Sequence, residues 1–219
     1  MTEPEYDSQM RSYKSCLNPK MINACLSETG ITGAKSVQKN LEKYHKNIKR
    51  IILSPMRRVI QTFEYAFSEY PQFKQNTLKI SFIPELRECL TSTACVGTWT
   101  EDQFEDLKHL HLYDFSFMES FPNPNFWFFY SMMPSKIQEA ESIISEGKTT
   151  QEKLSSLADN FAEVYPKKWE GNESSYQRMT VARKKLWEII KEENLQDGEL
   201  CIITHKNTLN WFLDYDKKT

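Results

Sequence analysis

Residues 48–58 read IKRIILSPMRR, and this stretch indicates the fold. Its first part, Ile48 to Leu53, is rich in β-branched side chains, which favours a short buried strand. Ser54 and Pro55 then predict the start of a helix that continues to about Glu69. Ser54 can cap that helix, and proline is well tolerated in a first turn.

The same alternation of strand and helix continues on both sides of this stretch. Residues 34–47 place apolar side chains at helical spacing, and residues 78–83 alternate as a second strand. A long helix is predicted at about 174–194, a strand at 200–204, and a last helix from 207 to 213. Strands that alternate with helices predict a mostly parallel central sheet with helices on both faces, which is a three-layer α/β sandwich.

The stretch from about residue 90 to 170 is too long for a simple crossover between strands. We expect it to be a helical cap insertion over the sheet, within a single domain that spans residues 1–219. An acidic helical segment is predicted at 101–111, and an aromatic stretch runs from Phe121 to Tyr130. This aromatic stretch either packs inside the cap or faces a protein partner.

The composition argues against several classes of protein. The 28 basic and 30 acidic residues nearly balance, so no nucleic-acid surface is indicated. No apolar run approaches the roughly 20 residues that span a bilayer. Residues 1–7 are polar and acidic, unlike a signal or transit peptide. The five cysteines form no CxxC pair, which indicates reduced thiols. We expect a cytoplasmic protein without a membrane span, a metal or a cofactor.

Polar residues follow three of the predicted strands, where ligands bind in open α/β sheets. They include Arg58, Glu88 and His205. A guanidinium group can bind phosphate oxygens with two parallel hydrogen bonds, and a carboxylic acid can protonate a leaving oxygen. The set therefore suits a phosphorylated or other anionic ligand. The structural alternative is that Arg58 and Glu88 are solvated surface charges and that His205 is a satisfied structural histidine.

Several motifs resemble the histidine phosphatase superfamily, to which the phosphoglycerate mutases belong. Residues 54–62, SPMRRVIQT, resemble its S-P-x-x-R-x-x-Q-T motif, and residues 202–205, IITH, resemble its late strand ending in Thr-His or Ser-His. Residues 86–88, LRE, are similar to its L-x-E acid motif. Glu173-Ser174, followed by Arg183, is similar to the start of its long helix. The resemblance covers about residues 11–213 and implies a phosphoglycerate mutase-like fold.

The histidine that such an enzyme uses as its nucleophile is missing. The family motif R-H-x-E-S-x-x-N corresponds to RSYKSCLN at residues 11–18, where Arg11 matches the first arginine and Ser12 takes the place of the histidine. Imidazole attacks phosphorus and leaves it readily, whereas a serine hydroxyl needs an adjacent base. The resemblance therefore implies that Ser12, Glu88 and His205 are vestigial catalytic positions. Arg11, Arg58 and His205 would still be able to hold phosphate.

Three hypotheses follow from these observations. The first is a catalytically inactive histidine phosphatase-like protein with a structural, assembly or anion-sensing role, as a subunit of a larger complex with protein partners. The second is an active phosphomonoester phosphatase or mutase with a rearranged nucleophile. The third is that the motif match is accidental. For the anion site, the residue types predict an affinity that falls at high salt and above the pKa of His205.

Overall fold

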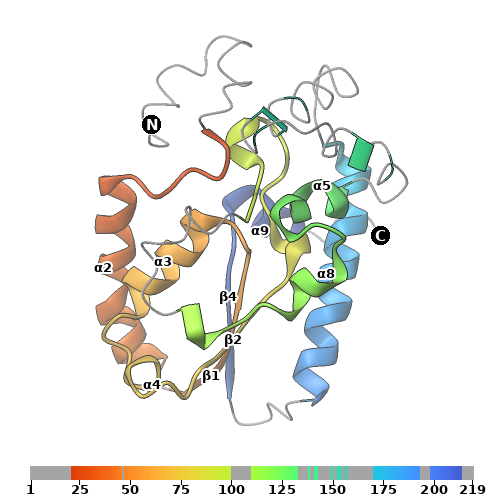
Figure 1. Ribbon diagram of the computed structural model, residues 1–219. Helices are drawn as coiled ribbons and strands as arrows, with labels where there is room; N and C mark the ends of the chain where they lie inside the picture. Colours follow the sequence, from red (N-terminus) through yellow and green to blue (C-terminus); the bar gives the residue numbers. More distant parts are fainter. Residues whose placement is uncertain are drawn as a thin grey trace.

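The computed structural model describes residues 21–45, 47–99, 110–132, 170–192 and 198–213, with a few single positions between 138 and 156. At its centre lies a four-stranded sheet in which every neighbouring pair of strands is parallel (Figure 1). The strands, in the order β3-β2-β1-β4, are β1 (Ile48–Leu53), β2 (Lys79–Phe82), β3 (Tyr113–Asp114) and β4 (Glu199–Ile203). The predicted α/β class is therefore confirmed.

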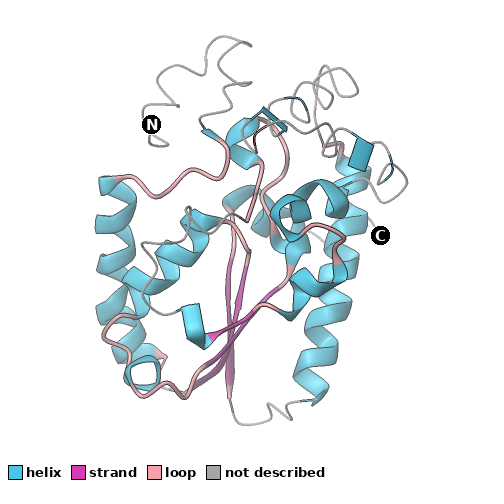
Figure 2. Cartoon of the chain, in the orientation of Figure 1, coloured by secondary structure: helices cyan, strands magenta, loops and turns pink. Residues whose placement is uncertain are grey.

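Helices surround this sheet on both sides (Figure 2). The α-helices are α2 (Glu28–Tyr44), α3 (Arg57–Phe67), α4 (Pro71–Lys74), α5 (Trp127–Met132), α8 (Asn172–Glu192) and α9 (Lys206–Leu213). Short 3-10 helices are η3 (Pro84–Leu86), η4 (Thr93–Cys95), η6 (Leu110–Leu112), η7 (Ser116–Ser120) and η8 (Pro124–Phe126).

The two faces of the sheet are built by the alternation of side chains along β1. Ile51 and Leu53 point to one face and pack in the cluster that includes apolar residues of α2, α3 and α4. Ile52 points to the other face and packs with residues of α8 and α9. Both faces are apolar because successive side chains of a strand point in opposite directions and a parallel sheet is covered twice. β1 is thus the central buried strand that its composition predicts.

The helix predicted at 34–47 is longer at its start than its apolar spacing indicated. α2 begins at Glu28, because the Ser27 hydroxyl caps it by accepting a hydrogen bond from the Gly30 amide at 3.1 Å. Of the apolar residues in the predicted stripe, Val37 and Tyr44 are 42% and 61% exposed. The stripe is therefore narrower than predicted.

The apolar side predicted for the long helix is wrong at one position. The pattern placed Val181, Leu186, Ile189 and Ile190 on that side, but Val181 is 44% exposed. Leu186 is buried together with Met179 and Ala182, and Ile189 packs against the same cluster. These residues lie at helical spacing, as an apolar stripe requires.

The stretch predicted to be a cap contributes directly to the main core. β3 lies within it and pairs in parallel with β2. Phe126, Trp127, Phe128 and Tyr130 are buried in the same apolar cluster as β1. For these four residues, the internal-packing alternative is correct and the partner-facing one is wrong. Residues 100–109 and most of 133–169 lie outside the described residues, so the cap and its boundaries stay a prediction.

Candidate functional site

Ser54, Arg58 and His205 meet at the carboxyl ends of β1 and β4. Ser54 directly follows β1, and its amide donates to the Ile203 carbonyl at 3.1 Å, so the backbone ladder with β4 continues to this point. His205 lies two residues beyond the end of β4, and Arg58 lies in the first turn of α3. The exposed fractions of Ser54, Arg58 and His205 are 0%, 8% and 6%. The strand-end prediction thus identified a buried polar cluster.

The hydrogen bonds of His205 determine its tautomer. Arg58 Nη2 lies 3.1 Å from His205 Nδ1, and His205 Nε2 lies 3.0 Å from the Ser54 hydroxyl oxygen. A guanidinium group has no acceptor, so Arg58 must donate and Nδ1 must accept. The proton of the neutral ring is therefore on Nε2, and Nε2 donates to Ser54 Oγ.

The electrostatic surroundings favour the same neutral state. Burial is the main cause that lowers the pKa of His205 well below its ordinary value, and the charges of Arg58, Arg178 and Arg87 lower it further. His205 is consequently uncharged at neutral pH. The expectation that anion affinity falls as His205 loses a proton above its pKa does not hold near neutrality, because the ring has no charge to lose there.

Ser54 does not cap the helix as predicted. α3 begins at Arg57, its N-cap is Met56, and no side chain caps it. Ser54 is still in register with β4, so its hydroxyl points toward His205 rather than toward the helix amides. The cap prediction was wrong because α3 begins only at Arg57, three residues after Ser54, and the Ser54 amide still bonds to the β4 backbone.

Glu88 lies near this cluster without joining it. Its Oε2 is 3.9 Å from His205 Nδ1, which is beyond hydrogen-bond distance, and its Oε1 accepts from the Cys89 amide at 2.8 Å. The structure therefore places the predicted acid beside the predicted histidine. Arg11 and Ser12 lie outside the described residues, so their predicted places in the site stay predictions.

The charge of Arg58 has no carboxylate in contact among the residues described. Its Nη1 donates to the Ala94 carbonyl at 2.8 Å and its Nη2 donates to neutral His205. Both acceptors are uncharged. A buried cation of this kind is costly unless an anion approaches it.

The remaining motif residues of α3 have local structural roles. The Gln61 side-chain oxygen accepts from the Leu26 amide at 2.8 Å, and the Thr62 hydroxyl donates to the Arg58 carbonyl at 2.8 Å. Gln61 thus joins α3 to the segment that precedes α2. These bonds position Arg58 without contacting the site.

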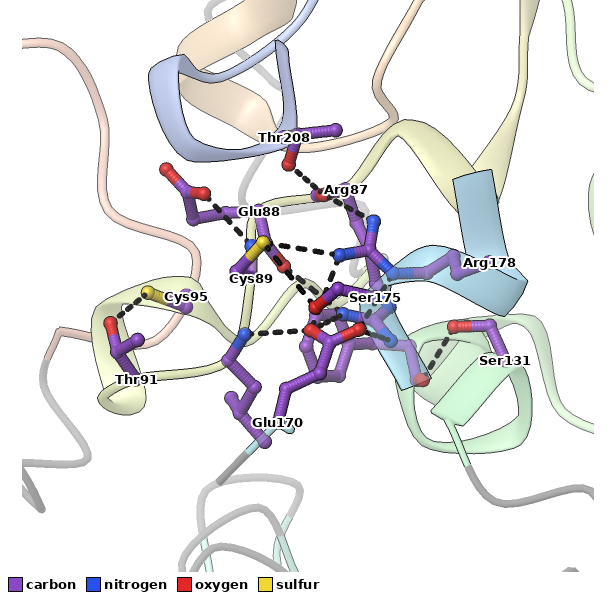
Figure 3. A network of polar contacts seen from close by, with 12 residues as sticks. Arg87, Glu88, Cys89, Thr91, Cys95, Ser131, Glu170, Ser175, Arg178 and Thr208 are labelled. Carbon is purple, nitrogen blue, oxygen red and sulfur yellow. Dashed lines mark hydrogen bonds and ion pairs between the residues drawn. The ribbon is translucent and has the colours of Figure 1, made fainter. Parts of the chain in front are cut away.

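A second buried charge cluster lies beside the site and was not predicted. The Glu170 carboxylate is bound by Arg87 Nη1 at 2.8 Å, by Arg178 Nε at 2.7 Å and by the Leu90 amide at 2.9 Å (Figure 3). Burial alone would raise the pKa of Glu170, but the two arginines outweigh it and lower this pKa to about 2. Burial and the charge of Arg178 lower the pKa of Arg87 to about 10.

The triad of Arg87, Glu170 and Arg178 includes Arg87 but not the next residue, Glu88. Figure 3 shows Glu88 pointing away from the Glu170 carboxylate, although Glu88 directly follows Arg87. Arg87 and Arg178 thus share one carboxylate of the chain itself, and the triad keeps one net positive charge. Arg58 differs from them because neither of its described partners, the Ala94 carbonyl and His205, is a carboxylate.

Further hydrogen bonds connect α8 and the end of β4 to the segment that follows β2. Arg178 Nη1 donates to the carbonyls of Glu85 and Arg87 at 2.6 and 2.9 Å. On either side of His205, the Thr204 and Thr208 hydroxyls donate to the carbonyls of Leu86 and Arg87, both at 2.6 Å. The His205 segment is therefore tied to the segment that carries Glu88.

The properties of the Cys89 thiol and the described bonds of Arg183 give neither residue a role in the site. Burial raises the pKa of the Cys89 thiol, which disfavours a thiolate. Arg183, which resembles a family position, donates to the carbonyls of Trp211 and Phe212 near the end of α9. Within the described part of the chain, no group of three or more His, Cys, Asp or Glu side chains is arranged to hold a metal ion.

Comparisons with known proteins give one similarity. The chain is 32% identical over 77 residues to a protein of Schizosaccharomyces pombe that is named "Probable phosphatase". The match covers 35% of this chain and 35% of that relative, so it spans about a third of each. No family model and no solved structure matches the chain. In the ranges that the structure describes, no helix has the length and apolarity to cross a membrane.

Proposed function

We propose that this protein is a degenerate histidine phosphatase, phosphoglycerate mutase-like in fold, that binds a phosphate-bearing ligand and does not hydrolyse it. The observation that carries the proposal is Arg58, a guanidinium that is 8% exposed and whose two recorded partners are uncharged. Anion binding would relieve the cost of burying that charge. The similarity to a protein named as a phosphatase supports a phosphate as the anion.

The surroundings of His205 support the absence of catalysis. To activate Ser54 as a substitute nucleophile, His205 would have to accept the hydroxyl proton at Nε2. Arg58 occupies Nδ1 as a donor, so Nε2 carries the proton and cannot accept another. Ser12, at the family's nucleophile position, lacks the imidazole that phosphoryl transfer uses. A ligand would thus be held without a competent nucleophile.

A binding protein of this kind fits a role in assembly or sensing. Phosphate bound to Arg58 would link α3 to η4 and to the end of β4, because Arg58 contacts both Ala94 and His205. We propose that the protein acts in the cytoplasm as a subunit of a larger complex, with ligand binding as the event that is sensed.

The second candidate is an active phosphomonoesterase. Glu88, whose Oε2 lies 3.9 Å from His205 Nδ1, supports this candidate as the group that would protonate a leaving oxygen. This candidate requires Arg58 to turn toward the phosphate and to release Nδ1. His205 could then present a different tautomer, and a nucleophile would still have to be supplied.

Calorimetric titration with inorganic phosphate and with phenyl phosphate at low salt tests binding. We expect saturable binding that Arg58→Met weakens about tenfold or more, because a charge-assisted hydrogen bond is lost. The matched control is Lys184→Met, which removes an exposed positive charge from α8. Thermal unfolding of each variant separates a folding defect from a lost ligand. Equal affinity in Arg58→Met and the wild type would contradict the proposal.

Hydrolysis of an aryl phosphate separates the two candidates. We expect no turnover by the wild type, and weak turnover by Ser12→His if the rest of the pocket is intact. Wild-type turnover that His205→Ala abolishes would establish the second candidate instead. Phosphate binding with no turnover would support the first.

A further inference from the structure

A hollow of about 640 Å³ lies beside β3, at the opposite edge of the sheet from β4. Its apolar lining includes Trp99, Phe115, Met118 and Pro124. Trp99 precedes the undescribed segment 100–109, and Phe115 directly follows β3. Of the aromatic stretch that the sequence offered as a partner surface, Pro124 lines this hollow, whereas Phe126, Trp127, Phe128 and Tyr130 are buried in the core.

The aromatic walls of the hollow are held in place by the core. The rings of Trp99 and Phe115 lie 4.5 Å apart between centroids at an interplanar angle of 60°. Phe115 also stacks on Phe82 of β2 at 5.1 Å. The Trp99 amide donates to the Asn125 carbonyl at 3.2 Å. Two inclined, preorganised rings can accept a cation with little loss of side-chain entropy.

The polar lining of the hollow is acidic. Asp114 and Glu119 are both exposed and both line it, and the lining described includes no basic residue. Asp114 is fixed, because its Oδ1 accepts from the Ser116 amide at 3.0 Å and its Oδ2 accepts from the Ser81 hydroxyl at 3.1 Å. Although burial raises its pKa, these bonds and the charge of Arg50 lower it overall, so Asp114 is ionised at neutral pH.

We propose that this hollow is a docking site for a partner protein, and that it binds an arginine or lysine side chain of the partner's docking segment. The cation would lie against the Trp99 and Phe115 rings, and its charge would be met by Glu119 and Asp114. The complementarity of charge specifies the occupant, because an uncharged apolar segment would partly desolvate the carboxylates of Glu119 and Asp114 without bringing a positive charge to them. The site is independent of phosphate binding at Arg58.

The test uses the full chain labelled with ¹⁵N and two capped tripeptides. The first has arginine between two alanines, and the second has citrulline in its place, which keeps the shape and removes the charge. The five tryptophan indole signals report on binding, and Trp99→Phe assigns the signal of Trp99. We expect the arginine peptide to shift the Trp99 signal saturably at millimolar concentration. The citrulline peptide should leave it in place.

Matched variants test the acidic lining. Glu119→Gln should lower the affinity for the arginine peptide about twofold to fivefold, as expected for one exposed ion pair. Glu188→Gln, which removes an exposed charge from α8, should not weaken it. The proposal is overturned if the arginine peptide does not shift the Trp99 signal, if both peptides shift it equally, or if both variants weaken binding alike. A Trp99 signal that depends on protein concentration without peptide would indicate a second copy of the chain as the occupant, and would also overturn it.

Discussion

Replacing Glu170 by glutamine tests the energetics of the buried triad. The carboxylate of Glu170 is fully buried and lies between Arg87 and Arg178. Glu170→Gln keeps the size of the side chain and one acceptor oxygen but removes the negative charge, which leaves two guanidinium groups close together. Removing one partner of a buried ion pair costs about 3–5 kcal/mol. We therefore expect a loss of at least about 3 kcal/mol in the free energy of unfolding at pH 7.

The pKa of Glu170 gives a second estimate of the same quantity. Its pKa falls from 4.5 to about 2 on folding. Each pH unit corresponds to about 1.4 kcal/mol, so ionised Glu170 stabilises the fold by roughly 3 kcal/mol. Because the folded-state pKa is the lower one, this stabilisation is complete above about pH 4.5 and is lost as the pH falls toward 2. The difference between wild type and variant should shrink to about 1 kcal/mol at pH 3.

Urea unfolding followed by circular dichroism measures the loss of stability at pH 7 and its decrease at pH 3. In thermal unfolding, a loss of about 3 kcal/mol corresponds to a decrease of about 6–12 °C in Tm for a chain of this size. The matched control is Glu69→Gln, which breaks the exposed pair with Lys74 and should cost below about 0.5 kcal/mol. A loss below about 1 kcal/mol for Glu170→Gln at pH 7 would refute the argument. If the variant does not fold, the wild-type stability must still fall between pH 4.5 and pH 2.

Two further predictions concern the histidine and the glycines. His205 should keep its neutral state with the proton on Nε2 in ¹⁵N spectra of the imidazoles as the pH falls from 8 through 6.5, and a titration midpoint near pH 6.5 would contradict this. Below about pH 6.5 the imidazole of His205 takes up a second proton in the unfolded chain but not in the folded chain. The free energy of unfolding should therefore decrease as the pH falls below 6.5, and this decrease should be smaller in His205→Asn. Gly97→Ala should cost about 1–3 kcal/mol, because its Cβ would lie 2.3 Å from Trp127 Cζ2 in the core. Gly33→Ala in α2, with no atom within 4 Å of the new Cβ, should instead stabilise by about 0.4–1 kcal/mol, and urea unfolding of both variants checks the contrast.

The class of the fold was predictable from local patterns. β-branched runs, helical spacing and strand ends depend on neighbours in sequence, and these patterns located β1, β2, β4 and α8. β3 was missed because it has two residues, too few to show a period of two. The buried side of α8 was misassigned at Val181 because one apolar residue can fall on either side of a broad stripe.

The candidate site was predictable in part for the same reason. Arg58, Glu88 and His205 each follow a strand, and parallel strands bring their carboxyl ends to one edge. The protonation states and hydrogen-bond partners of the site residues were not predictable. His205 is neutral chiefly because it is buried, and the charge of Arg58, 147 residues away in the chain, lowers its pKa further. The role of Ser54 was misjudged because its hydrogen bond is to His205, 151 residues away.

The sequence by itself therefore determined the alternation of β1, β2 and β4 with helices, the residues that follow these strands and the absence of histidine at position 12. Only the tertiary structure decided which of the buried arginines are paired with a carboxylate. Arg87 and Arg178 share Glu170, whereas Arg58 meets two uncharged acceptors. The physical reason is that the cost of a buried charge depends on which groups lie within a few ångströms of it, and Glu170 is 83 residues from Arg87 in the chain.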